Sequence, residues 1–138
     1  MEEAPVQAIP GNQKQCTSND VSITAADGFQ PLPGLGVTVN NGGVARKAIV
    51  QLSADQCVDA NAEVRIAYSI DGGIPQEGVF GPSNFANHQE FCETRMTMAV
   101  IPLSAGTHTI RPHWRVSGSS EKEAVDVGRC ITVESRTQ

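Results

Sequence analysis

The chain has 138 residues and a formal net charge of −5, with 39% hydrophobic and 18% charged residues. A chain of this length forms one domain that buries about two thirds of its unfolded surface, and it is too apolar for disorder. No apolar run reaches the roughly 18 residues that span a bilayer, so we expect no membrane span. The acidic balance argues against nucleic-acid binding, which requires a net basic face.

The N-terminal stretch, MEEAPVQAIPGNQKQ, is acidic, contains proline and lacks the apolar segment of a signal peptide. We therefore expect residues 1–18 to form a flexible arm and residues 19–138 to form a single β-sandwich domain. An export signal that was removed before this chain begins is an open alternative.

Apolar and polar residues alternate through most of the chain, as they do in strands with one buried face. The runs are short and are separated by Gly, Pro, Asn and Ser. This pattern predicts an all-β fold: an antiparallel, jelly-roll-like β-sandwich of about eight strands. The expected strands span residues 21–25, 35–39, 44–53, 62–73 (ending in a turn), 94–103, 106–116 and 128–135, with residues 123–127 as an additional candidate.

Two connections between these strands stand out. Asn41-Gly42 lies between two apolar runs and predicts a hairpin, because both residues tolerate positive φ angles. The longest break, residues 72–93, carries three of the four phenylalanines. We expect those aromatic rings to cap one end of the core, with a functional loop as the alternative.

The four cysteines, Cys16, Cys57, Cys92 and Cys130, are too widely spaced for a zinc site built from paired ligands. Two disulfides are the natural expectation and indicate an oxidising compartment, while four free buried thiols are the alternative. Four cysteines allow three connectivities, and we expect Cys57–Cys92 and Cys16–Cys130. Closing the first of these loops stabilises the fold by roughly 3–4 kcal/mol in the chain-entropy model.

The segment AGTHTIRPHWRVSG, residues 105–118, divides by parity into an apolar face and a polar face. We expect Trp114 to be buried on the first. On the second, Arg111, His113 and Arg115 follow one another at intervals of about 7 Å, a spacing suited to an extended anion such as an acidic glycan. Asn84 and His88 of the long break would lie nearby. The alternative is a solvated face paired with carboxylates.

The sequence contains none of the common catalytic signatures, such as a nucleophile elbow, a phosphate-binding loop or a zinc-protease motif. We therefore expect no enzyme activity and no cofactor. A metal site would draw on His88, His108, His113 and Glu90, but two of these histidines lie on opposite faces of one strand, and we expect no metal.

The order of several short motifs resembles poorly characterised secreted bacterial domains of the C1q/TNF-like jelly-roll type. The motifs are GLGVTV, Cys57, SIDGG, Cys92 and LSAGTHTIRPHWRV, and the resemblance covers about residues 30–134. It implies a disulfide between Cys57 and Cys92, an extracytoplasmic location and a homotrimer. It assigns no catalytic residue.

Together these observations predict a non-enzymatic recognition or assembly module, secreted, periplasmic or on the cell surface, with a protein or glycan ligand. A carbohydrate- or anion-binding module that uses the basic strand face is the alternative. A small hydrolase built on scattered carboxylates is a third hypothesis.

Overall fold

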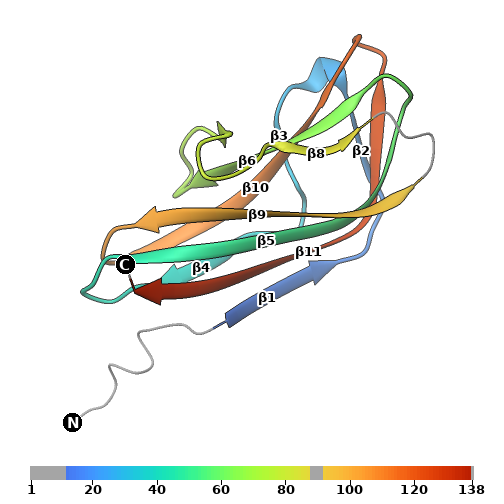
Figure 1. Ribbon diagram of the computed structural model, residues 1–138. Coiled ribbons are helices and arrows are strands. Elements are labelled where there is room, and N and C mark those ends of the chain that lie inside the picture. Colours follow the sequence, from blue (N-terminus) through green and yellow to red (C-terminus); the bar gives the residue numbers. More distant parts are fainter. Residues whose placement is uncertain (1–11, 88–91, 138) are drawn as a thin grey trace.

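Two antiparallel β-sheets pack face to face in the computed structural model, which describes residues 12–87 and 92–137 (Figure 1). The fold is therefore the expected all-β, jelly-roll-like sandwich. Among the described residues, no helix is long and apolar enough to cross a bilayer.

Sheet A contains β1 (Asn12–Thr17), β2 (Val21–Thr24), β5 (Arg46–Val58), β9 (Glu93–Leu103) and β11 (Glu123–Thr137). Sheet B contains β3 (Gln30–Pro31), β4 (Val37–Asn40), β6 (Glu63–Ile70), β7 (Gln76–Glu77), β8 (Asn84–Asn87) and β10 (Thr107–Ser117), and a 3-10 turn, η1 (Ala25–Asp27), follows β2.

The strands of sheet A follow the order β1-β11-β5-β9, and β2 pairs with the first part of β11. Sheet B follows the order β3-β10-β6-β7, in which β4 also pairs with β10 and β8 with β6. Most neighbours in the sheets are distant in the sequence, so the long strands β5, β9, β10 and β11 hold the sandwich together.

The core lies between the two sheets and is built by the alternation seen in the sequence. In β10, Ile110, Trp114 and Val116 point inward, and Trp114 is only 1% exposed. In β5 and β9 the inward residues are every second one, ending in the buried pair Ile101 and Leu103. The largest side chain of the core, Trp114, therefore comes from the middle of the central strand of sheet B.

Strand β1 corrects the expected boundary of the N-terminal arm. Residues 12–17 pair in register with β11, and Cys16 lies directly opposite Cys130, to which it is disulfide-bonded. The domain therefore includes residues that we expected in the arm, because their backbone hydrogen bonds complete the edge of sheet A. The rest of the expected arm, residues 1–11, lies outside the described residues.

Both disulfides have the expected connectivity, Cys16–Cys130 and Cys57–Cys92. The first joins two neighbouring strands of sheet A, and the second joins the end of β5 to the residue before β9. Two disulfides in a domain of this size favour an oxidising, extracytoplasmic environment.

The predicted hairpin at Asn41-Gly42 is wrong. The turn connects β4 of sheet B to β5 of sheet A, so its flanking strands do not pair with each other. The Asn41 backbone N–H donates to the Gly106 carbonyl, and its side-chain amide donates to the Ser104 carbonyl at 2.9 Å. The turn chemistry was recognised correctly, but these contacts direct the chain across the sandwich.

Strand β11 contains a bulge between Asp126 and Gly128, where its register with β5 shifts. Before the bulge Ala124 and Asp126 point inward, whereas after it Arg129, Ile131 and Val133 do. This change of parity made one long strand look like two short ones in the sequence.

The free edge of β9 is covered by the segment that follows β7. The Phe80 carbonyl accepts a hydrogen bond from the Val100 backbone N–H at 3.0 Å, and the Phe80 side chain packs against the core. A Cβ atom placed at Gly81 would lie against the Met98 carbonyl oxygen, closer than van der Waals contact. This agrees with a capping role for Phe80. The other two phenylalanines of the long break, Phe85 and Phe91, are not among the described side chains.

Trp114→Ala is expected to lower the free energy of unfolding by about 3–5 kcal/mol, because the substitution leaves a large cavity between the sheets. Urea unfolding followed by circular dichroism measures the difference. The control is Val44→Ala at an exposed turn residue, which should change the stability by no more than about 0.5 kcal/mol. A Trp114 variant as stable as the control would contradict this packing.

Candidate functional site

A row of large apolar side chains lies on the outer face of sheet A. Met96, Met98 and Val100 point outward from β9 and are 66%, 48% and 41% exposed. Ile49 lies opposite Val100 on the neighbouring strand β5, in register with it. We call these four residues the methionine face. Three exposed apolar side chains in consecutive outward positions are unusual on a soluble surface and indicate an interaction site.

The centre of the methionine face is uncharged, and charged residues lie at its rim: Glu134 opposite Ile49, and Lys47 and Asp55 toward the two ends of the outward row of β5. The next outward residues on β5 are Gln51, opposite Met98, and Ser53, opposite Met96. Beyond them, on β11, lies Thr132. Interface centres are typically depleted of charge and enriched in methionine, so the composition of this face fits an interface better than a solvated sheet.

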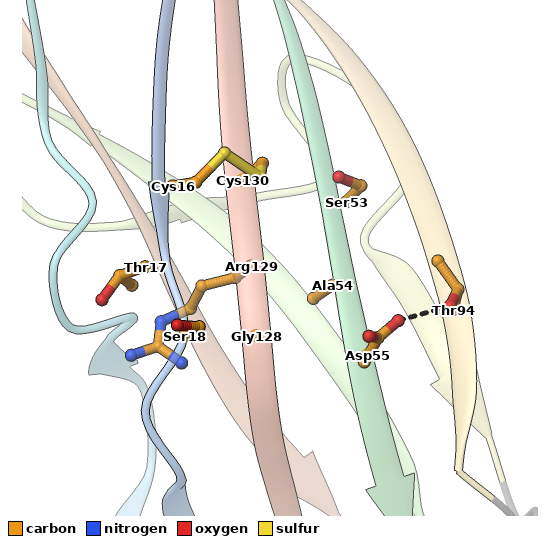
Figure 2. Close-up of a pocket in the computed structure, with 10 residues that line it drawn as sticks. All are labelled: Cys16, Thr17, Ser18, Ser53, Ala54, Asp55, Thr94, Gly128, Arg129 and Cys130. Carbon is orange, nitrogen blue, oxygen red and sulfur yellow. Dashed lines mark hydrogen bonds between the residues drawn. A yellow bond between two sulfur atoms is a disulfide. The ribbon is translucent and has the colours of Figure 1, made fainter.

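A hollow of about 330 Å³ opens on the same face of sheet A (Figure 2). Gly128 lies at its centre, with the Cys16–Cys130 disulfide to one side. On the other side the Thr94 hydroxyl donates a hydrogen bond to the Asp55 carboxylate. The hollow thus combines apolar walls with a few polar groups, the usual composition of a binding site.

The backbone conformation at position 128 does not require a glycine. Gly128 is not among the glycines with positive φ, and an added Cβ would meet nothing closer than the Thr17 carbonyl oxygen at 4.0 Å. The fold would therefore accept a side chain here. A larger residue would fill the space, so Gly128 is the residue that keeps the hollow available.

The methionine face and the hollow adjoin each other. Ser53 lines the hollow, and its register partner on β9 is Met96. One sheet face therefore carries a projecting flexible apolar side chain next to a recess of the size that could receive one.

The alternation in the sequence identified the two faces of β9 without showing which one is buried. Residues Thr97, Ala99 and Ile101 form the buried row, and the methionines form the exposed row. Both rows are largely apolar, and an apolar row on the exposed face of a strand indicates an interaction surface. The sequence analysis did not draw that conclusion.

The basic residues singled out in the sequence lie on the outer face of the opposite sheet, and they do not form one exposed row. His113 is 9% exposed, and burial lowers the pKa of its imidazole, which favours the uncharged form. Arg115 lies 3.3 Å from a carboxylate oxygen of Glu77 and packs over the Phe29 ring, 5.3 Å from its centroid. Arg111 is exposed.

Of the other predicted ligands, Asn84 lies on β8 with its side chain not described, and His88 lies outside the described residues.

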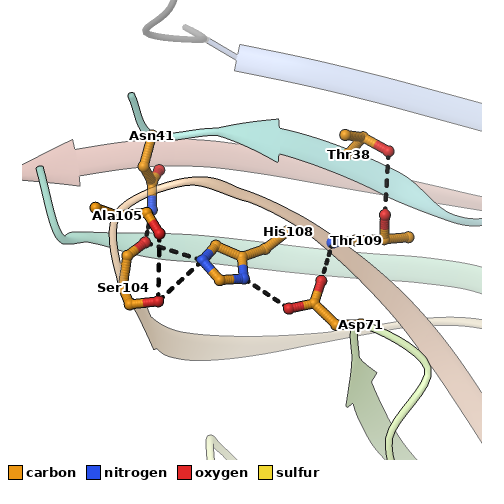
Figure 3. Close-up of polar contacts among 7 residues, drawn as sticks. All are labelled: Thr38, Asn41, Asp71, Ser104, Ala105, His108 and Thr109. Atoms are coloured by element: carbon orange, nitrogen blue, oxygen red, sulfur yellow. Dashed lines mark hydrogen bonds and ion pairs between the residues drawn. The ribbon is translucent and has the colours of Figure 1, made fainter. Parts of the chain in front are cut away.

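A second cluster, which the sequence analysis did not assemble, lies where three loops meet (Figure 3). His108, at the start of β10, has its Nδ1 2.7 Å from Oδ2 of Asp71, in the turn after β6. Its Nε2 lies 2.9 Å from the Ser104 carbonyl oxygen and 3.2 Å from the Ser104 hydroxyl oxygen. We call Asp71, Ser104 and His108 the His108 cluster. Each residue is separated by at least three positions from the others, so alternation alone could not reveal it.

The hydrogen-bond partners of His108 indicate which of its ring nitrogens carry protons. A carboxylate and a backbone carbonyl can only accept hydrogen bonds, so both ring nitrogens have an acceptor when the imidazole is protonated, and this arrangement favours the cation. The hydrogen bond to Asp71 raises the pKa of His108, and the same bond lowers the pKa of Asp71. The charged imidazole therefore joins the β6–β7 turn to the β9–β10 turn.

No family model and no curated protein matches this sequence. Among solved structures, the Eiger TNF of S. frugiperda is similar in fold, with a TM-score of 0.50 and 11% identity over 94% of this chain and 96% of that one. A chain of infectious bursal disease virus, Gx strain, gives a TM-score of 0.52 at 8% identity over 89% of this chain, which spans 32% of the viral chain. At such identities the likeness shows a shared jelly-roll-like fold and nothing finer.

The stability that His108 contributes is expected to fall as the pH rises. Its pKa is raised in the folded state, so the contribution is complete below the unfolded value of about 6.5 and is lost through the folded pKa. The effect should be about 1 kcal/mol or less, because Asp71 is exposed. Urea unfolding at several pH values, with an NMR titration of the imidazole, measures both quantities. In Asp71→Asn the pKa of His108 should fall, and an unperturbed His108 in the native protein would contradict the ion pair.

Proposed function

We propose that this protein is an extracytoplasmic recognition or assembly module that associates with copies of itself through the methionine face. The observation that carries the proposal is the row of Met96, Met98 and Val100, which are exposed in consecutive outward positions of β9. The two disulfides support a secreted, periplasmic or cell-surface location.

A second copy of this chain is the occupant that the face fits best. The chain has a net charge of −5, so copies meet with least repulsion where the surface is uncharged. The recess at Gly128 and the projecting Met96 lie side by side, so one copy can insert its methionine into the hollow of the next. Such head-to-tail contacts close into a ring when the rotation between copies permits.

The proposed ring is a homotrimer. The order of motifs in the sequence resembles C1q/TNF-like domains, which implies a trimer, and the fold is similar to that of a TNF protein over nearly the whole length of both chains. Fully burying an exposed methionine or valine contributes about 1.5–3 kcal/mol. The three side chains are already partly buried, so each contributes part of that value to the free energy of association.

Light scattering on a sizing column without reductant should give a mass near three times 14.6 kDa. Met98→Lys should give a folded monomer, because the substitution places a charge at the centre of the contact. Ile74→Lys is the matched control, since Ile74 is an exposed apolar residue of a turn in the other sheet and should leave the mass unchanged.

The hollow is tested separately by Gly128→Leu, which fills it. We expect the melting temperature to change little and the trimer to dissociate at a higher concentration than the native protein. A native protein that stays monomeric at all concentrations, or a Met98→Lys variant that stays trimeric, would contradict the proposed interface.

A carbohydrate- or anion-binding module is the second candidate function, and the exposure of Arg111 favours it. Among the described residues, Arg111 pairs with no carboxylate, and its guanidinium lies over Gly36. Arg115 is the second cation of this face and is paired with Glu77, whereas His113 is buried. Arg111→Ala should elute from a heparin column at lower salt than the native protein, whereas Lys47→Ala on the opposite sheet should not. Equal elution of the native protein and Arg111→Ala would remove this candidate.

A further inference from the structure

The His108 cluster has the arrangement of a nucleophile, its general base and an orienting acid. The carboxylate of Asp71 faces Nδ1 of His108 at 2.7 Å, and the hydroxyl of Ser104 faces Nε2 at 3.2 Å (Figure 3). Each group thus meets the ring nitrogen that this chemistry requires. We propose that Ser104 is a nucleophile that attacks exposed carboxylic esters, with His108 as its general base.

Both carboxylate oxygens of Asp71 are held by hydrogen bonds. One oxygen of Asp71 accepts from His108, and the other accepts from the Thr109 backbone N–H at 2.8 Å. The Asp71 backbone N–H in turn donates to the Thr109 carbonyl at 2.8 Å. These bonds fix the carboxylate against the start of β10, so the imidazole orientation does not depend on a mobile side chain.

Hydrogen bonds to its carbonyl oxygen also hold the backbone of Ser104 in place. The Ser104 carbonyl accepts from the Asn41 side-chain amide at 2.9 Å and from His108 Nε2 at the same distance. Its hydroxyl lies on the exposed turn between β9 and β10, where an incoming molecule can reach it. The side chain can therefore rotate toward a substrate without moving the turn.

Protonation of His108 decides which partner Nε2 takes. In the cation Nε2 donates to the Ser104 carbonyl, and it cannot act as a base. In the neutral ring the proton stays on Nδ1, facing the Asp71 carboxylate, and the lone pair of Nε2 faces a carbonyl that offers no proton. The Ser104 hydroxyl is then the adjacent donor, so loss of the proton converts a structural contact into a nucleophile–base pair.

In the described part of the chain, Asp71 is the titratable group that contacts His108 and affects its protonation. The strand β4 packs beside His108 and presents Val39 in register, and the turn after β4 presents Asn41. The turn before β10 presents the hydroxyl and carbonyl of Ser104. The hydrogen bond to Asp71 keeps the pKa of the imidazole above its ordinary value. The reactive form therefore becomes populated at a higher pH than it would in an isolated imidazole.

The reaction is a two-step acyl transfer. The Ser104 oxygen attacks the ester carbonyl carbon while its proton passes to Nε2, and the ester C–O bond then breaks, with the alcohol taking that proton. Water attacks the resulting acyl-serine, giving a proton to Nε2. The carboxylic acid is released, and the proton returns to Ser104.

The substrate is an ester that needs no enclosing pocket. Neither Ser104 nor His108 lines the hollows found in the described part of the chain. The rate enhancement therefore comes from the general base and its orientation, which is worth about 10²–10⁴-fold. This corresponds to slow turnover of small or projecting acyl groups.

Hydrolysis of p-nitrophenyl acetate by the full chain tests the proposal. Ser104→Ala should lower the rate by about 100-fold or more, to the level of the uncatalysed reaction. Ser120→Ala, which alters an exposed serine of the β10–β11 turn, should keep the native rate. A fluorophosphonate probe should label Ser104, as located by peptide mass spectrometry.

The pH dependence distinguishes a general base from a structural histidine. The native rate should rise with pH through the titration of His108 measured by NMR, and in Asp71→Asn the midpoint should move to lower pH. Circular dichroism confirms that each variant is folded. Equal rates for Ser104→Ala and the native protein, or label on residues other than Ser104, would overturn the proposal. Neither result would affect the proposed assembly through the methionine face.

Discussion

The buried ion pair between Arg129 and Asp126 is the contact on which the arrangement of sheet A depends. Its two charged groups lie 2.9 Å apart, and neither side chain is exposed. Burial raises the pKa of Asp126, and the hydrogen bond from Gln56 and the charge of Arg129 oppose that rise. The Arg129 guanidinium also donates to Asn19 and to the Pro33 carbonyl, so it fastens the segments on either side of β2 to the centre of the sheet. Removing one partner of such a pair typically costs about 3–5 kcal/mol, because the other charge is left buried.

The same ion pair explains why the outer face of sheet A is hollow. The bulge between Asp126 and Gly128 lets two residues only three positions apart both point inward, and this directs Gly128 outward. The recess and the position of the disulfide beside it therefore follow from one irregularity of β11. The His108 cluster lies at the far end of β9, beyond the methionine face. Ser104 is four residues from Val100, or about 13 Å along the chain, so the proposed assembly through the methionine face would leave that turn accessible.

The sequence predicted most of the strands because their alternation is regular and their turns are rich in Gly, Asn and Pro. It predicted Trp114 in the core for the same reason. The disulfides join residues 114 and 35 positions apart, so alternation does not determine their pairing. It could not predict how the Asn41-Gly42 turn continues, since the contact to Ser104 joins residues far apart in the chain. It placed His113 on the correct face of β10 but could not foresee its burial. The His108 cluster escaped prediction because Asp71 and His108 meet only when β6 and β10 pair.

The close approach of Gly81 to the Met98 carbonyl has a consequence for the solution behaviour of the protein. Strand β9 is an edge strand whose outward face is apolar, and such an edge is a template for strands from other molecules. The segment at Phe80 and Gly81 occupies part of that edge. Any side chain at position 81 would push the segment away and leave backbone N–H and C=O groups unpaired beside exposed methionines. The absence of a single methyl group at position 81 thus keeps part of this edge covered and opposes its growth into open-ended β-sheet aggregates.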